Sequence, residues 1–201
     1  MNNNYLYDYV QPFERILSFA YKNKYSYEMV EHVISHSSFF QRIESDKNNY
    51  PPIVDELSLI KDLFNTSTID LTELPSYNQC SWAAESYLRI QDKTKLTFEA
   101  IFLFIPIKKM FEYFSLFHEM DFTQIVDEFN RLYAQNSVLE LLLVKYNYSL
   151  KYISQKIGLP YDTLFSYKQR RRDIKKMSAE SAVMLANIFR VRVETLLELK
   201  I

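Results

Sequence analysis

Glycine is almost absent from this chain, since Gly158 is the only one among 201 residues. A glycine-rich loop that cradles phosphate groups therefore cannot form, which excludes the nucleotide-binding proteins built on such a loop. Cysteine is equally scarce: the single Cys80 has no partner for an intramolecular disulfide, so we expect a reducing, cytoplasmic environment. A chain with one glycine is expected to use it at a positive φ in a tight turn.

Long apolar runs are also missing from the sequence. The most apolar stretch, residues 96–107, contains 12 residues and includes Glu99 and Pro106. A transmembrane helix needs about 20 apolar residues, so we expect no membrane span. The N-terminus has no charged and apolar leader with a cleavage site, which again favours a cytoplasmic protein. Apolar residues make up 48% of the chain and aromatic residues 16%, enough for a buried core.

Residues typical of catalytic and metal sites are few and scattered. His32 and His36 lie four positions apart on a predicted helix, but no glutamate or third ligand completes a zinc motif of the HExxH kind. His118, with Glu119 beside it, and Cys80 are isolated in the sequence. We therefore expect no enzyme activity, no catalytic residue, no metal and no cofactor.

Helical spacing of apolar residues predicts an all-α protein, and it is clearest around Gly158. Ser149 is a suitable N-cap for a helix that ends at Gly158, and Pro160 then opens a second helix through Lys168. Two short helices joined by a glycine-bearing turn are typical of a helix-turn-helix. The buried positions we expect in these two helices are Leu150, Ile153, Ile157, Leu164 and Tyr167.

The flanking sequence extends this pattern to five short helices in residues 136–201. A helix that ends near Tyr146 precedes the pair, a helix capped by Ser178 follows it, and a last helical turn begins at Val193. This order resembles the phage-repressor (Cro-like, xenobiotic-response-element) helix-turn-helix family, with two departures. Ser154 stands where the family usually has alanine between the two helices, and Arg170 stands where it often has glycine.

The resemblance implies a sequence-specific transcription regulator that binds double-stranded DNA as a dimer. In that family the helix after the turn enters the major groove, and the following loop and the helix starts contact phosphates. The helix 160–168 would therefore read DNA, and its base-contacting residues would be Tyr161, Asp162, Phe165 and Ser166. The implied phosphate contacts are Ser149, Lys151, Thr163, Lys168, Arg170, Arg171, Arg172, Lys175 and Lys176.

The distribution of charge agrees with this division. Residues 136–201 hold 12 Lys and Arg against 6 Asp and Glu, whereas the first 135 residues hold 12 against 19. A positive domain attached to a negative one is typical of a DNA-binding protein with a separate assembly or sensing part. We therefore expect a DNA-binding domain over 136–201 and, before it, a helical body.

The body is expected to have two parts, residues 1–74 and the aromatic-rich residues 75–135. In the first, we expect a tail over 2–9, a helix behind Pro12, and a helix capped by Ser26 that buries Met29, Val30 and Val33. Apolar positions of residues 10–74 also align with the C-terminal domain at offsets of 124 and 125, so this part is a candidate diverged second copy.

The second part of the body is expected to assemble or to sense, and a protein or peptide is a candidate partner for it. Thr97 would cap one of its helices, and Pro106 would end that helix, so that a new one starts at Ile107. A brief strand over 102–105 is the alternative. The segment also weakly resembles uncharacterised regulators of low-GC Gram-positive bacteria, to which no function is attached.

A rival hypothesis is a protein-interaction module of a phage or mobile element. Such a protein, an antitoxin or an inhibitor of a host defence nuclease, would grip its partner with the acidic, aromatic body. Its helix-turn-helix would serve only to regulate its own gene. An exposed aromatic patch of several hundred Å² on the body would favour this hypothesis.

Overall fold

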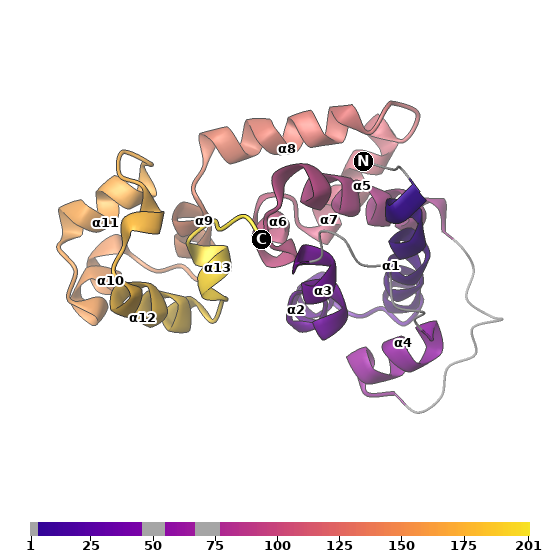
Figure 1. The fold of residues 1–201 in the computed structure, drawn as a ribbon, viewed down its shortest axis with the longest axis horizontal. Helices are drawn as coiled ribbons and strands as arrows, with labels where there is room; N and C mark the ends of the chain where they lie inside the picture. Colours follow the sequence, from indigo (N-terminus) through magenta and orange to yellow (C-terminus); the bar gives the residue numbers. More distant parts are fainter. Residues whose placement is uncertain (1–3, 46–54, 67–76) are drawn as a thin grey trace.

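The computed structural model describes residues 4–45, 55–66 and 77–201. In these ranges the chain forms thirteen α-helices, one short 3₁₀ helix and no strand (Figure 1), which confirms the predicted all-α class. The helices are α1 (Asn4–Lys22), α2 (Tyr27–His36), α3 (Ser38–Ser45), α4 (Glu56–Phe64), α5 (Asn78–Thr94), α6 (Phe98–Phe104), α7 (Ile107–Phe117), α8 (Thr123–Gln135), α9 (Val138–Lys145), α10 (Leu150–Ile157), α11 (Tyr161–Lys168), α12 (Ala179–Phe189) and α13 (Val193–Leu196), with the 3₁₀ helix Ile174–Lys176 before α12.

The helices form two groups, which we call the body (α1–α8) and the C-terminal unit (α9–α13). Within the body, α1, α6, α7 and α8 all pack against α5, and α2 packs against α6. The C-terminal unit lies at one end of the molecule, and α8 runs from the body towards it (Figure 1). Its helices α9 and α13 face α6, so α10 and α11 are left at the end farthest from α1 and α4.

Aromatic rings make up much of the core of the body. Phe13, on α1, meets the rings of Phe40, Tyr87 and Phe98, with centroids 4.7, 6.0 and 5.8 Å away. All four side chains are fully buried. The Tyr87 hydroxyl donates a hydrogen bond to the Ile105 carbonyl at 2.9 Å, so its polar atom is satisfied inside the core.

The predicted helix starts and stops are mostly confirmed, because side-chain caps and proline act locally. Ser26, Thr97, Ser149 and Ser178 each accept a hydrogen bond from the backbone N–H three residues on, as N-caps do. Pro106 separates α6 from α7, so the brief strand over 102–105 is not formed.

Two predictions for the first helices are wrong. The helix α1 begins at Asn4 and continues through Pro12, where we expected a tail. Its buried stripe extends back one turn from Phe13 to Tyr9, and this packing keeps the helix intact despite the backbone hydrogen bond that proline removes. In α2, Val30 is buried as predicted, but Met29 is exposed and Val33 is half-buried, and Ile34 is buried instead. The pair Met29 and Val33 and the pair Val30 and Ile34 both have helical spacing, so spacing alone did not show which pair is buried.

The proposed second copy remains a prediction. The order α2, α3, α4 corresponds to α10, α11, α12, and the residues from Thr68 to Leu74 lie outside the described ranges. The connections differ, because α2 and α3 are joined by Ser37 alone in an extended conformation, without the left-handed residue that ends α10.

Buried carboxylates and an arginine connect the body to the C-terminal unit at their boundary. Nη2 of Arg192, at the start of α13, lies 2.8 Å from both carboxylate oxygens of Glu44 on α3. Its backbone N–H donates to Glu99 on α6 at 3.0 Å. Burial raises the pKa of the Glu44 carboxyl above its ordinary range, and the charge of Arg192 opposes that rise. Two more hydrogen bonds cross this boundary, between Thr97 Oγ1 and Thr195 Oγ1 (2.8 Å) and from the Ile201 N–H to the Lys95 carbonyl (2.8 Å).

Candidate nucleic-acid interface

The turn between α10 and α11 has the geometry that the lone glycine predicts. Gly158 ends α10 with φ +69° and ψ +12°, in the left-handed region. A Cβ placed there would meet no atom within 4 Å, so the requirement for glycine comes from the backbone alone. The hydroxyl of Ser154 donates to the Leu159 carbonyl at 2.6 Å. Serine at this position therefore fits between the helices and also holds the turn.

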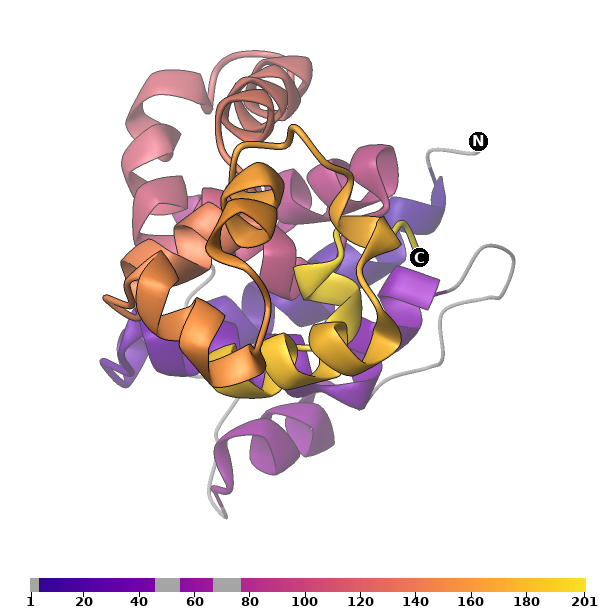
Figure 2. The same cartoon turned by 90° about the vertical axis from the view of Figure 1, so that its left-hand side faces the viewer.

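The buried side of the pair is formed as predicted. Leu164 and Tyr167 of α11 are buried, as are Ile153 and Ile157 of α10. The opposite side of α11 therefore faces solvent, and Figure 2 looks onto this end of the molecule, with α10, α11 and the following loop in front of the body.

The four residues predicted to contact bases all lie on α11, but they are exposed to different degrees. Tyr161 is 48% exposed and Asp162 is also exposed, whereas Phe165 and Ser166 are half-buried. The rings of Tyr161 and Phe165 stack with centroids 6.0 Å apart. The Ser166 hydroxyl donates to the Asp162 carbonyl at 2.7 Å, so its proton is already used within the helix. Tyr161 and Asp162 are thus the most accessible of the four.

Arg170 is exposed, but its guanidinium is held by contacts within the protein. Its backbone adopts φ +55°, which explains why glycine suits this position in the family that the sequence resembles. Its Nη2 lies 2.9 Å from Glu198, its Nε donates to the Asn136 carbonyl at 3.1 Å, and its guanidinium lies 4.3 Å from the centre of the Tyr133 ring. These contacts form a bridge from the loop to α8 and to the turn after α13 and leave the side chain about one-third exposed, so its phosphate contact stays a prediction.

Glu198 is the centre of that bridge, a role that its sequence position does not indicate. Its carboxylate is buried and accepts hydrogen bonds from the Tyr133 hydroxyl at 2.6 Å and from the Val138 N–H at 3.1 Å, in addition to pairing with Arg170. Burial and the adjacent carboxylate raise the pKa of Tyr133, which keeps its hydroxyl protonated as a donor. A glutamate in the last turn of a chain resembles an ordinary surface residue, so no local signal marks this role.

The remaining cations of the loop have no acidic partner within the described part of the chain. Arg171, Arg172, Lys175 and Lys176 are all exposed. The two guanidinium groups lie 5.9 Å and 5.4 Å from the ring centres of Phe165 and Tyr167, respectively, so the loop rests against α11. At its far end the loop is anchored by Ile174 and Met177, which are buried, and by Asp173, which caps the 3₁₀ helix. Four exposed cations are thus held on a loop that is fixed at both ends.

The other residues predicted to contact phosphates differ in their exposure and in their partners within the protein. Lys168 pairs with Glu140 at 3.1 Å, and the two side chains are about one-third exposed. The Ser149 oxygen accepts from the Tyr152 N–H, but its hydroxyl proton is free to reach a phosphate. Lys151 is exposed, whereas Thr163 is half-buried.

His32 and His36 lie together on α2, whereas Cys80 lies on α5. His32 and His36 stack with ring centroids 4.2 Å apart, and within the described residues no cluster of three potential metal ligands occurs. Cys80 is buried, and burial raises the pKa of its thiol to about 11, so it is protonated at neutral pH.

No protein-family model, curated protein or solved structure matches the chain. In the described part of the chain, every helix is too short or too polar to cross a bilayer.

Proposed function

We propose that the chain is a cytoplasmic, sequence-specific DNA-binding transcription regulator. The observation that supports this most strongly is the loop after α11, on which Arg171, Arg172, Lys175 and Lys176 are exposed at the end of the molecule that carries α10 and α11 (Figure 2). Cations at such a position neutralise phosphates and release counterions, which supplies affinity for DNA of any sequence. The accessible residues of α11 would then supply the choice of sequence.

The electrostatics of the C-terminal unit favour this use of the loop. Lys168, Arg170 and Arg192 have acidic partners within the protein, whereas the four loop cations and the exposed Lys151 and Lys156 of α10 are available to an external anion. On α10 and on the loop, these six cations outnumber one exposed carboxylate, that of Asp173. The surplus of positive charge is therefore located on α10 and on the loop.

We expect two copies to act together. One such unit buries too little surface for tight, specific binding, and operators of helix-turn-helix proteins usually have two-fold symmetry. The faces of α9 and α13 that meet α6 are already covered by the body. We therefore place the contact between copies on the body, which would also serve as the sensing part.

Removing the loop cations should weaken binding to every DNA sequence. The double variants Arg171→Ala/Arg172→Ala and Lys175→Ala/Lys176→Ala should each lower the slope of log K against log salt by about 2, and raise the Kd up to about tenfold per lost contact at 0.1 M salt. The measurement is fluorescence anisotropy with two duplexes, the DNA upstream of the protein's own gene and a scrambled version, across a salt series.

The matched control is Arg42→Ala, which removes an exposed arginine from the body and should leave the slope unchanged. Unfolding curves of the two double variants should match that of the unsubstituted protein, because these side chains are exposed. If both double variants keep the full salt slope, the loop does not contact phosphates.

Substitution of Tyr161 should instead affect the choice of sequence. Tyr161→Ala removes an exposed ring that can pack on thymine methyl groups, so the preference for the upstream duplex should fall about fivefold, corresponding to about 1 kcal/mol, with the salt slope unchanged. Competition between the two duplexes measures this ratio. Tyr152→Ala, which removes a similarly exposed ring from α10, is the control, and an equal loss in both variants would mean that α11 does not read bases.

A protein partner is the second candidate function, and one observation favours it. A groove of about 390 Å³ between α9 and α11 is lined by Val144, which is 75% exposed, and by Tyr148, Tyr161 and Phe165. On the body, Tyr21 is the only exposed aromatic residue among the side chains that the structure describes, so the groove is better suited to a partner than the body. Weak and equal binding of both duplexes by the folded protein would favour this candidate.

A further inference from the structure

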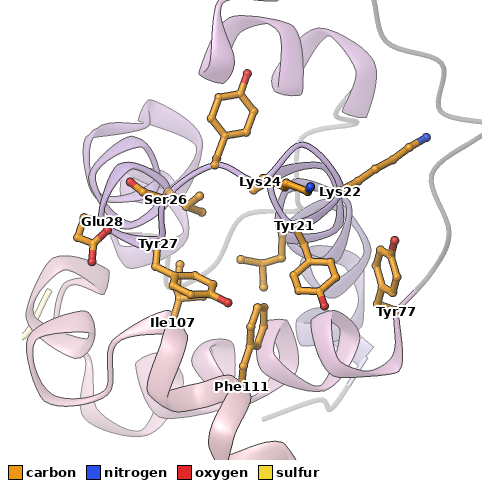
Figure 3. Close-up of a pocket in the computed structure, with 13 residues that line it drawn as sticks. Tyr21, Lys22, Lys24, Ser26, Tyr27, Glu28, Tyr77, Ile107 and Phe111 are labelled. Atoms are coloured by element: carbon orange, nitrogen blue, oxygen red, sulfur yellow. The ribbon is translucent and has the colours of Figure 1, made fainter.

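A cleft in the body, remote from α10 and α11, has the properties of a small-molecule site. It has a volume of about 570 Å³ and lies where the α1–α2 corner faces the start of α7 (Figure 3). Ligand pockets in proteins usually measure about 300–1,000 Å³ and are mostly apolar, with a few polar groups that orient the ligand. The size of this cleft falls inside that range.

Its walls are aromatic. Tyr77, Tyr21, Phe111 and Tyr27 form a row in which each ring meets the next edge-to-face, with centroids 5.1, 6.1 and 5.8 Å apart. Phe111 lies between Tyr21 and Tyr27, and the hydroxyls of these two tyrosines lie near its ring (Figure 3). A planar aromatic ligand can pack against such a row by the same edge-to-face or stacked contacts.

The polar groups of the cleft are mostly hydrogen-bond donors. Four tyrosines line it, namely Tyr21, Tyr25, Tyr27 and Tyr77. Burial and the neighbouring Tyr21 raise the pKa of Tyr27, so its phenol remains protonated. At the rim stand Lys22, Lys24 and Glu28, and Lys24 is exposed. Protonated phenols and ammonium groups favour an acceptor with negative charge, such as a carboxylate.

We propose that this cleft binds a small aromatic carboxylate, whose ring packs on Phe111 and Tyr21 and whose carboxylate meets the phenols and Lys24. An organic cation would gain from the aromatic rings but would be repelled by Lys24 at the rim. The proposal concerns binding at the cleft alone and does not rest on DNA binding by α11, so either one can fail without the other.

The test uses three probes of nearly the same shape: 2-naphthoate, 2-naphthalenemethanol and 2-naphthylmethylamine, which are anionic, neutral and cationic at pH 7. Titration of the full chain, followed by two-dimensional NMR of its backbone amides, reports both affinity and location. For a ligand of this size we expect a Kd of about 10 µM to 1 mM for 2-naphthoate. Shifts should be concentrated at Tyr21, Tyr27, Ile107 and Phe111, and the amine should bind at least tenfold more weakly.

Variants that preserve the fold separate the two parts of the site. Lys24→Gln, at an exposed position, should reduce the preference for the acid over the alcohol, and Tyr21→Phe with Tyr27→Phe should do the same while keeping both rings. Lys108→Gln removes an exposed lysine from α7 outside the cleft and should change nothing. The proposal is overturned if the acid does not bind at millimolar concentration, if the amine binds as well as the acid, or if the shifts lie elsewhere.

Discussion

Replacing Arg192 with alanine is expected to lower the free energy of unfolding by about 3–5 kcal/mol, because it leaves buried carboxylates without their cation. Glu44 is 3% exposed and Glu99 is 9% exposed, and Arg192 is the basic group next to both, at 2.8 Å and 4.0 Å. The hydrogen bond from the backbone N–H of residue 192 to Glu99 survives the substitution, so the loss reports on the side chain.

Urea unfolding at pH 7, followed by circular dichroism, measures this change. Arg190→Ala removes an exposed arginine two residues earlier and should cost less than about 0.5 kcal/mol. Adding Glu44→Gln to the Arg192→Ala variant removes the stranded charge and should restore part of the stability. A loss no greater than that of Arg190→Ala would show that the carboxylates find other partners or are protonated.

Replacing Glu31 with glutamine is expected to stabilise the protein above neutral pH. The Glu31 carboxylate is buried on α2, where it accepts a hydrogen bond from the Ile107 N–H at 2.8 Å. Burial raises its pKa from 4.5 to about 7, since the charged form is poorly solvated. Between about pH 4.5 and 7, the folded chain therefore keeps a proton on Glu31 that the unfolded chain releases. The stability that this proton contributes is complete below pH 4.5 and is lost as the pH rises through 7.

The expected difference is about 2–3 kcal/mol in favour of Glu31→Gln at pH 8, and it should shrink towards zero near pH 5. Glutamine keeps an oxygen that can accept from the Ile107 N–H, so the substitution removes only the charge. Urea unfolding at pH 5, 6, 7 and 8 measures the difference, and Glu28→Gln, at an exposed position of the same helix, is the control. Parallel stability curves for the variant and the unsubstituted chain would mean that Glu31 stays charged throughout.

Much of the helical order could be predicted because its causes are local. Helices begin at a serine or threonine that precedes an apolar stripe, and they end at a proline or at the lone glycine. Thr97, Pro106 and Gly158 start or end helices where the sequence indicates. Packing across distance is different. The phase of the stripe in α2 and the start of α1 depend on which neighbours bury them, and spacing alone does not contain that information.

In the candidate interface, too, some features follow from local spacing and others depend on distant contacts. That Leu164 and Tyr167 are buried, and Tyr161 and Asp162 exposed, follows from helical spacing around the turn. The ion pair of Arg170 depends on Glu198, which is distant in the sequence. The sequence does not indicate that Arg170 has a buried acidic partner, whereas the guanidinium of Arg171 lies near the Phe165 ring.

The aromatic cleft could not be predicted at all, because its parts come from four separate elements. Tyr21 ends α1, Tyr27 begins α2, Tyr77 precedes α5 and Phe111 lies on α7. Each of these residues alone resembles an ordinary core aromatic, and only the fold brings their rings into one row.

The buried pairing of Arg192 with Glu44 and Glu99 has a consequence for how the molecule would span DNA. A unit tied to α3 and α6 by charges and hydrogen bonds cannot swivel on a flexible tether, so α11 keeps one orientation relative to the body. In a dimer joined through the bodies, the two α11 helices would therefore stay at one fixed distance from each other. Such a dimer would accept one spacing between half-sites and would reject an operator lengthened by a few base pairs.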